Sequence, residues 1–388
     1  MTKSHLLLTV LLLGGMLSSC SRSTEKAEGL PYRVEIGNMT DSLKISYSDL
    51  FSDVRYVVIK DTAEESVIKR LSHLEITKDN DLIVLDDGLD RVLRFDSEGN
   101  FLNKIGDKGH AANEYVSPRA MTYDPVSDLV LVYSSGKLLF YHLDGTFDHY
   151  VKLKENMIFH ITVVQHKYII AERAYLFSGT EEDKHNFQIY DMEGNYLSGF
   201  EYLPDLGYTG IVMPQSNQFC PADDGGMLCL STYSSTMYKV KDGEVTPFIE
   251  FVPTWGEWCI GRPEQIKECF NKKFETAIDW AKLVDDKLYV KVLGGRSYYD
   301  FLLCYDLKTK QMRVGRNIIN DVYGVAGYYL RLEALKDRKF YFYFMPRDFE
   351  RILESWGDKE VEPENKEFVT RMSQLEGQHI LQICTLKE

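Results

Sequence analysis

The sequence predicts an all-β protein: a six-bladed β-propeller with four-stranded antiparallel blades and a short helical insertion in the last blade. Three observations support this prediction. An acidic glycine turn recurs along the chain, with Gly99, Gly145, Gly194 and Gly243 at intervals of 46, 49 and 49 residues. Runs of β-branched and aromatic residues flank each turn, and helical periodicity is absent from these runs. A repeat of about 45 to 50 residues that carries four strands is typical of a propeller blade.

Each repeat has the same order of elements. A β-rich run is followed by a short polar link, a second run that ends in an acidic residue, a glycine turn and a further strand. The turn at 96–100 has the sequence DSEGN, and its near-copy at 191–195 has the sequence DMEGN. Glycine supplies the positive φ of a tight hairpin, and Asp or Asn hydrogen-bonds to its own backbone there. We therefore expect these turns at equivalent places in successive blades. The visible repeats are residues 82–106, 129–151, 168–200, 227–248 and 288–315.

The remaining segments predict a sixth blade and the closure of the ring. Residues 41–388 comprise 348 residues, about 58 for each of six blades. The runs GYYLRLEAL and KFYFYF (327–335 and 339–344) look like strands, residues 347–377 look helical, and HILQICTLKE (379–388) looks like a final strand. The early segment 42–59 is expected to pair with that final strand, which would cover two strand edges.

The N-terminus has the features of a lipoprotein signal peptide over residues 1–19. Lys3 precedes an apolar run from Leu6 to Leu13, which is shorter than the roughly 20 residues that a spanning helix needs. The sequence LSSC ending at Cys20 resembles a bacterial lipobox, in which the cysteine becomes lipidated. We expect residues 20–40 to be the lipidated cysteine and a flexible tether, and residues 41–388 to be the propeller. Ser21 favours an outer-membrane lipoprotein, and both a periplasmic and a surface-exposed location stay open.

The charge of the chain argues against nucleic-acid binding. Without residues 1–19, 44 Lys and Arg face 59 Asp and Glu, which gives a formal charge of −15. Such a balance repels nucleic-acid backbones and anionic lipid surfaces. We therefore expect membrane attachment through the lipid on Cys20 and no nucleic-acid partner.

The cysteines and histidines do not predict a metal site or a cofactor. Six cysteines follow Cys20, none in a CxxC pair or near histidines at zinc-finger spacing. The pairs nearest in sequence are Cys220 with Cys229 and Cys259 with Cys269, and the sequence leaves their pairing open. No HxH or HExxH spacing appears. Only His110 is placed in a convincing rim loop.

Several stretches resemble a known family. The lipobox, SYSDLFSDVRYVVIKD, LEITKDNDLIVLDD, RVLRFDSEGNFLNKIGDKGHAANEYVSP and the closing ILQICTLK are similar to the six-bladed β-propeller lipoproteins of Bacteroidota. The stretch from Ile105 to Pro118 also resembles an NHL repeat. The resemblance implies the propeller fold over about residues 41–388, and it implies no catalytic residues.

The predicted binding site lies on one rim of the propeller. Loops between the second and third strands of a blade share that rim with the crossovers between blades, and tyrosine, arginine and carboxylates there suit recognition of a sugar or a peptide. The candidates for ligand binding are Asp86, Asp87, Arg91, His110, Glu114, Tyr115, Arg119, Arg173, Tyr233, Arg296 and Tyr298.

Two functions of different classes fit this sequence. The favoured one is a lipid-anchored binding module for a glycan, a peptide or an envelope protein, since no catalytic spacing appears. The alternative is a lyase or hydrolase of NHL-like propeller type, acting at the mouth of the channel. Fold alone does not separate them. An enzyme would bring two titratable groups, or three metal ligands, together at the channel.

Overall fold

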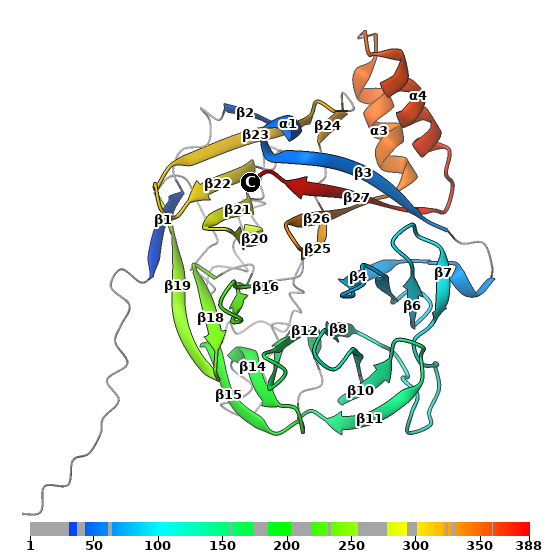
Figure 1. Cartoon of the computed structure of the whole chain (residues 1–388), viewed down its shortest axis with the longest axis vertical. Helices are drawn as coiled ribbons and strands as arrows, with labels where there is room; N and C mark the ends of the chain where they lie inside the picture. The colour runs from blue at the N-terminus through cyan, green and yellow to red at the C-terminus, as the bar shows by residue number, and fades with distance from the viewer. Residues whose placement is uncertain are drawn as a thin grey trace, which may run out of the picture. The chain divides into compact units, whose positions relative to one another are not determined.

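The computed structural model describes residues 31–36, 43–60, 64–154, 157–173, 185–202, 219–231, 234–254, 278–292, 301–322, 325–327, 331–358 and 360–388. Residues from Pro31 to Glu388 form one compact unit. Within it, six sheets surround a central axis (Figure 1), which confirms the predicted six-bladed propeller.

Each blade is an antiparallel meander that starts at the axis and ends at the periphery. Blade 1 consists of β4 (Leu71–Ile76), β5 (Leu82–Asp86), β6 (Arg91–Phe95) and β7 (Phe101–Lys104). Blade 2 consists of β8 (Ala120–Asp124), β9 (Leu129–Ser134), β10 (Lys137–His142) and β11 (Phe147–Lys152). Blade 3 consists of β12 (Ile158–Val164), β13 (Tyr168–Arg173), β14 (His185–Asp191) and β15 (Tyr196–Tyr202). Blade 4 consists of β16 (Phe219–Pro221), β17 (Met227–Cys229), β18 (Thr236–Lys241) and β19 (Glu244–Pro253). Blade 5 consists of β20 (Ile278–Val284), β21 (Lys287–Val292), β22 (Phe301–Asp306) and β23 (Met312–Asn320), and the short strand β24 (Val325–Gly327) pairs with β23.

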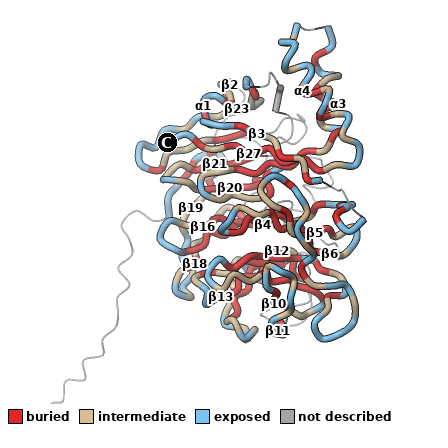
Figure 2. Tube along the Cα trace, turned by 45° about the vertical axis from the view of Figure 1, so that its right-hand side comes forward, coloured by how far each residue is buried: buried red, intermediate tan, exposed pale blue. Residues whose placement is uncertain are grey.

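The second strands are mainly apolar because both of their faces are covered, with Glu172 on β13 and Lys291 on β21 among the charged exceptions. In β5, Leu82 and Val84 pack against blade 6, whereas Ile83 and Leu85 pack against blade 2. A strand that is buried on both faces has a continuous apolar sequence instead of an alternating one. Figure 2 shows buried residues along the strands and exposed residues at the turns between them.

The acidic glycine turns join neighbouring blades. Asp96 Oδ1 accepts hydrogen bonds from the backbone N–H groups of Glu98 and Asn100, at 3.0 and 2.8 Å. Gly99 has φ of +79°, and a Cβ there would lie 2.2 Å from the carbonyl oxygen of Val58 in the preceding blade. A Cβ at Gly145 would lie 2.3 Å from the carbonyl oxygen of Lys104 in blade 1. The turns of blades 1 and 2 are therefore seated on the outer strand of the blade before them, and these contacts require glycine.

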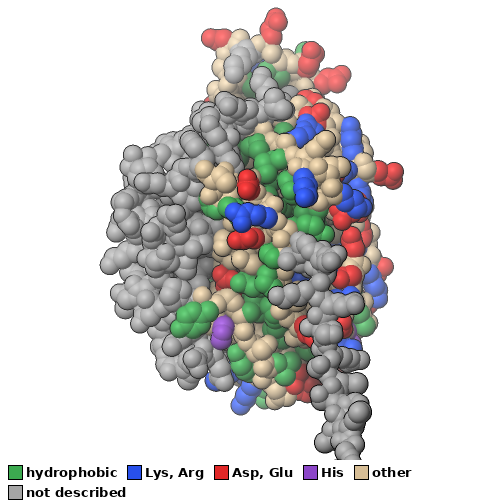
Figure 3. Space-filling model, turned by 90° about the vertical axis from the view of Figure 1, so that its left-hand side faces the viewer, with side chains coloured by type: hydrophobic (Ala, Val, Ile, Leu, Met, Phe, Trp, Pro, Cys, Tyr) green, Lys and Arg blue, Asp and Glu red, His purple; other side chains and the backbone are tan. Residues whose placement is uncertain are grey.

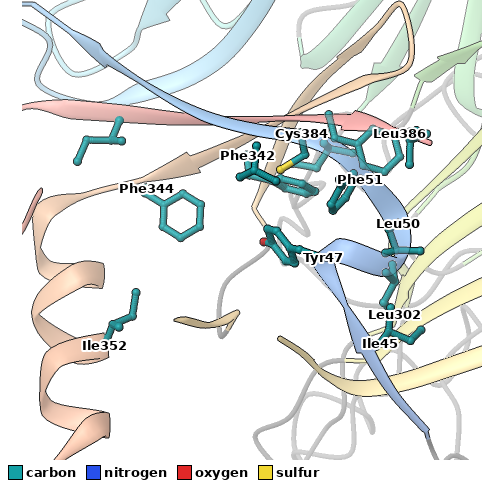
Figure 4. Close-up of a cluster of buried hydrophobic side chains, with 14 of the residues drawn as sticks. Ile45, Tyr47, Leu50, Phe51, Leu302, Phe342, Phe344, Ile352, Cys384 and Leu386 are labelled. Carbon is teal, nitrogen blue, oxygen red and sulfur yellow. The ribbon is translucent and has the colours of Figure 1, made fainter. Parts of the chain in front are cut away.

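The two ends of the propeller close the ring in the sixth blade. This blade consists of β25 (Leu332–Lys336), β26 (Lys339–Phe344), β27 (His379–Leu386) and β3 (Phe51–Ile59). Strand β3 pairs antiparallel with β27 over eight register pairs, which confirms the predicted closure. Figure 4 shows the core beside this seam, where Phe51, Phe342 and Cys384 belong to one buried cluster.

The segment before β3 departs from the prediction. Strand β1 (Tyr32–Ile36) pairs in parallel with β19, and β2 (Leu43–Ser46) pairs in parallel with β23. Val34 and Ile36 are fully buried beside Phe251. Residues 32–36, which precede the predicted start of the propeller at residue 41, therefore cover the otherwise open edge of blade 4.

Helices are few, and the main pair lies where the sequence predicts it. Helices α3 (Pro346–Trp356) and α4 (Pro363–Ser373) form the insertion between β26 and β27, while α1 (Tyr47–Leu50) and a 3-10 turn (Glu64–Ser66) are short. No helix among the described residues is long and apolar enough to cross a membrane. Figure 3 shows acidic side chains at the end of the molecule where α3 and α4 project. Exposed acidic residues of this hairpin are Glu350, Glu354, Asp358, Glu360, Glu362, Glu364 and Glu367.

Candidate functional site: the central channel

The first strand of every blade faces the axis, so these six strands form the wall of the central channel. They all run from the crossover that enters the blade to the turn that leads to the second strand. Their first residues therefore share one end of the channel, and their last residues share the other end. Polar side chains interrupt these strands: β4, for example, carries His73 and Glu75 between the buried Leu71, Leu74 and Ile76.

A cavity of about 460 Å³ occupies the end of the channel where the inner strands finish. All six blades contribute to its wall, through Glu75, Thr122, Thr162, Phe219, Lys282 and Ala334. This volume lies within the roughly 300–1,000 Å³ of ordinary small-molecule sites. The wall combines aliphatic and aromatic side chains with a small number of polar groups, which is the usual composition of such sites.

Two titratable side chains, Glu75 of blade 1 and Lys282 of blade 5, meet at this cavity. Burial raises the pKa of Glu75 to about 8, although a hydrogen bond with Thr122 and the charge of Lys282 act in the other direction. Burial lowers the pKa of the Lys282 ammonium below its ordinary value. Lys282 Nζ donates a hydrogen bond of 2.5 Å to the carbonyl oxygen of Phe219 on β16. At neutral pH Glu75 is therefore mainly protonated, so its carboxyl can donate a hydrogen bond.

A second polar group lies closer to the first residues of the inner strands. His160 Nδ1 is 2.9 Å from Glu172 Oε2, and the rings of His73 and His160 meet edge to face with centroids 5.0 Å apart. Burial lowers the pKa of both histidines to about 3 and raises the pKa of Glu172 well above its ordinary value. All three shifts favour the neutral forms of these side chains. Glu172 Oε1 and both side-chain polar atoms of Asn186 are buried, and a hydrogen bond with the Asn186 side chain opposes the rise in the pKa of Glu172.

Two ion pairs lie near the same end of the channel. Lys291 Nζ is 2.8 Å from Asp279 Oδ2, and Arg331 Nε is 2.5 Å from Glu333 Oε1. Burial raises the pKa of Glu333 to about 7, while Arg331 opposes that rise. A raised pKa of a buried, paired carboxyl such as Glu333 is common at functional sites.

The raised pKa of Glu75 predicts a pH-dependent stability. Its ordinary pKa is 4.5 and its folded-state pKa is about 8, so the folded state keeps a proton that the unfolded state loses between these values. This contribution to stability is present below about pH 4.5 and is lost as the pH rises through about 8. We expect Glu75→Gln to lose less stability than the wild type between about pH 5 and about pH 8 in thermal melts. Glu98→Gln, at an exposed turn, is the control, and equal pH profiles for wild type and Glu75→Gln would contradict the assignment.

Metal and disulfide chemistry find no support among the described residues. No group of three or more His, Cys, Asp or Glu side chains there is placed to hold a metal ion. Cys220 and Cys229 are free thiols, so this nearest pair does not form a disulfide. Cys259 and Cys269 lie outside the described residues.

Two of the predicted rim residues are structural. Asp86 is fully buried, and its carboxylate accepts hydrogen bonds from the backbone N–H groups of Lys69, Arg70 and Gly88. Tyr115 is also buried, and its hydroxyl donates to the carbonyl oxygen of Ile105. The polar atoms of these two side chains already satisfy buried backbone groups, and the prediction that they bind a ligand stays a prediction.

The other rim residues are spread out. Asp87 forms a bidentate pair with Arg70, and the Arg91 side chain donates to the carbonyl oxygen of Val67. Glu114 accepts a hydrogen bond from the backbone of Ala111. His110 and Arg119 are exposed, whereas Arg173 is buried. Tyr233, Arg296, Tyr298 and the lipidation candidate Cys20 lie outside the described residues, so the predictions for them and for the exposed rim residues stay predictions.

Sequence reasoning missed the channel residues for an identifiable reason. The repeats were aligned on the second to fourth strands, and the inner strands were left outside that alignment. The signal was nevertheless present, since LSHLEI, FHITVV, IDWAKLV and LEALK each place a charged residue or a histidine in a short apolar run. In particular, His73 and His160 looked scattered in sequence, yet the fold brings them into ring contact.

Comparisons with known proteins support the fold and leave the activity open. The model of the family described as "Domain of unknown function (DUF4934)" matches residues 31–384. A protein of Bacteroides fragilis NCTC 9343, described as exported, is similar over 92% of this chain and 100% of its own, with 14% identity and a TM-score of 0.70. A member of the DUF4221 family from Bacteroides vulgatus ATCC 8482 is similar over 87% of this chain and 98% of its own, with 9% identity and a TM-score of 0.50.

More distant similarity carries no argument about activity. Virginiamycin B lyase from Staphylococcus aureus reaches a TM-score of only 0.42 at 10% identity, over 75% of this chain and 81% of its own. No curated protein matches the sequence. The predicted resemblance to propellers of Bacteroidota is therefore supported in its fold and in its Bacteroides neighbours.

Proposed function

We propose that this chain, which belongs to the family described as "Domain of unknown function (DUF4934)", is a binding module of the cell envelope that holds a small molecule in its channel cavity. The observation that carries this proposal is the cavity of about 460 Å³ to which all six blades contribute. Residues 122, 162, 219, 282 and 334 come from five different blades and meet Glu75 there. A pocket of this size with a few polar groups in an apolar wall suits a compact ligand.

The cell envelope is the compartment that best suits this module. The Bacteroides fragilis neighbour is described as exported, and its fold matches this chain over nearly the whole length of both. The LSSC motif ending at Cys20 further supports lipidation and attachment to the outer membrane, with the propeller in the periplasm or at the cell surface. Of the ligand classes that the sequence predicts, a sugar unit or a short peptide end fits the cavity, whereas a long glycan or a folded protein would use the rim.

A ligand screen by thermal shift tests this function on the purified protein. A ligand that binds the folded state alone raises the melting temperature with its concentration. The panel contains mono- and disaccharides, short peptides, and calcium and EDTA as metal controls. We expect one class of compact ligand to stabilise the protein and neither metal condition to do so.

Two variants locate the binding site. Ala334→Phe fills the cavity and should abolish the shift, whereas Arg119→Ala changes the exposed rim and should preserve it. Thr162→Leu, on another blade, repeats the test if Ala334→Phe folds poorly. Loss of the shift in Arg119→Ala alone would place the site on the rim and overturn the channel assignment.

A channel lyase or hydrolase is the second candidate. It is favoured by one observation, the hydrogen bond of 2.9 Å between His160 and Glu172 beside His73, because convergent titratable groups are what general acid–base chemistry requires. The test is product formation, followed by chromatography, from any ligand that the screen identifies. Turnover that His160→Gln abolishes while binding persists would establish the enzyme, and an unchanged ligand after prolonged incubation would rule it out.

A further inference from the structure

The charge of the channel cavity differs from the charge of the chain as a whole. The chain carries 59 acidic and 45 basic residues, a formal charge of −14. Around the cavity this balance is reversed, because the lysines Lys78, Lys282 and Lys336 outnumber the acids Glu75 and Asp337. A concave site with an excess of one sign of charge attracts ligands of the opposite sign.

The lysines occupy different depths of the cavity. Lys282 is buried, with 3% of its surface exposed, and its ammonium is held in place by the carbonyl oxygen of Phe219. Lys336 lies at the end of β25, where its ammonium is 2.7 Å from the carbonyl oxygen of Thr77 in blade 1. Lys78 pairs with Asp128 at 2.7 Å, and the ammonium of Lys336 is also 3.4 Å from Asp337, so an acid lies beside each of these two lysines. The buried lysine is therefore the cation deepest in the cavity, and the other two stand at its entrance.

Glu75 does not cancel this positive charge at neutral pH. Its pKa of about 8 keeps the carboxyl protonated, and the groups that face it from neighbouring strands are Thr122 on β8 and Lys282 on β20. Lys282 in turn faces Glu75 and Glu172, together with the thiols of Cys220 and Cys229, and burial raises the pKa of each of these four groups. A protonated carboxyl and a nearby ammonium are two separate donor groups that can both hydrogen-bond to one acceptor.

We propose that the ligand of the channel cavity is a small organic acid whose carboxylate is bound by the Lys282 ammonium and the Glu75 carboxyl. Charge-assisted hydrogen bonds to a carboxylate are stronger than those between neutral groups, and the surrounding low dielectric increases their strength. The remainder of the ligand contacts the apolar wall, which includes Leu74, Val163 and Leu335. This inference rests on the proposed function and specifies the chemical class of its ligand.

Matched acid and neutral probes test the inference by isothermal titration calorimetry of the purified protein. The pairs are galacturonate with galactose, and phenylacetate with phenylacetamide. We expect at least one acid to bind at least about tenfold more tightly than its neutral partner. Lys282→Met should lower the affinity for that acid by at least about tenfold. Lys308→Met, an exposed lysine of the same blade that pairs with Asp286, should leave the affinity unchanged.

A pH series adds a readout that does not depend on removing Lys282. Deprotonation of Glu75 above about pH 8 places a second carboxylate beside the ligand, so acid binding by the wild type should weaken between about pH 7 and about pH 9. Glu75→Gln keeps a hydrogen-bond donor and should retain its affinity over that interval.

The outcomes separate this inference from the proposed function. If a neutral probe binds as tightly as its acid, or if Lys282→Met keeps full affinity for the acid, the inference fails while binding in the channel stands. If neither the probes here nor the wider screen detects binding that Ala334→Phe abolishes, the proposed function fails as well.

Discussion

Replacing Gly99 with alanine is expected to lower the stability of the propeller by roughly 2–4 kcal/mol, through two additive causes. The residue has φ of +79°, which costs an L-residue roughly 1 kcal/mol, and its Cβ would lie 2.2 Å from the carbonyl oxygen of Val58. Because Val58 belongs to β3, the clash pushes the turn of blade 1 away from the strand that closes the ring. The measurement is the midpoint and slope of urea unfolding, followed by tryptophan fluorescence.

Gly225 provides a control with matched backbone conformation. It has φ of +80°, and a Cβ there would meet nothing within 4 Å. Gly225→Ala should therefore cost only the backbone term of roughly 1 kcal/mol. Gly145→Ala, whose Cβ would lie 2.3 Å from the carbonyl oxygen of Lys104, should behave like Gly99→Ala. Equal losses in Gly99→Ala and Gly225→Ala would show that the contact between blades contributes little.

Placing a charge between β3 and its neighbours in the closing seam should lower the stability of the propeller at least as much as Gly99→Ala does. Val57 lies on β3, is 5% exposed, and packs in the cluster that joins blade 6 to blade 1. Val57→Asp buries a carboxylate there without a partner, which we expect to cost roughly 4 kcal/mol or more and to open the ring. The expected signs are a lower urea midpoint and early hydrogen exchange in β3 and β27, the two strands of the seam.

Arg55→Asp tests whether position or charge is responsible. Arg55 is two residues earlier on the same strand and is exposed. The same aspartate there should change the urea midpoint little, because surface substitutions usually stay within about 0.5 kcal/mol. A large loss in Arg55→Asp, or protection of β3 that is unchanged in Val57→Asp, would contradict the assignment of the seam.

The fold could be predicted from the sequence because its determinants are local and repeated. Four turns carry a glycine beside or close to an aspartate, the second strands are mainly apolar, and the spacing of Gly99, Gly145, Gly194 and Gly243 reports the size of a blade. The closing pair β3 and β27 was also predictable, since a propeller leaves two strand edges that must be covered. The edge strand β1 was missed because Tyr32–Ile36 is short and precedes the repeat.

The site depends on tertiary structure instead. Glu75 and Lys282 are 207 positions apart in the sequence, and only the ring brings their side chains to one cavity. The tertiary structure also decided that Asp86 and Tyr115 serve the backbone, although their residue types and rim positions suggested binding. Periodicity determines which residues form strands and turns, because those depend on neighbours in the chain. It does not determine which polar side chain keeps its atoms available, because that depends on every group that the closed ring brings against it.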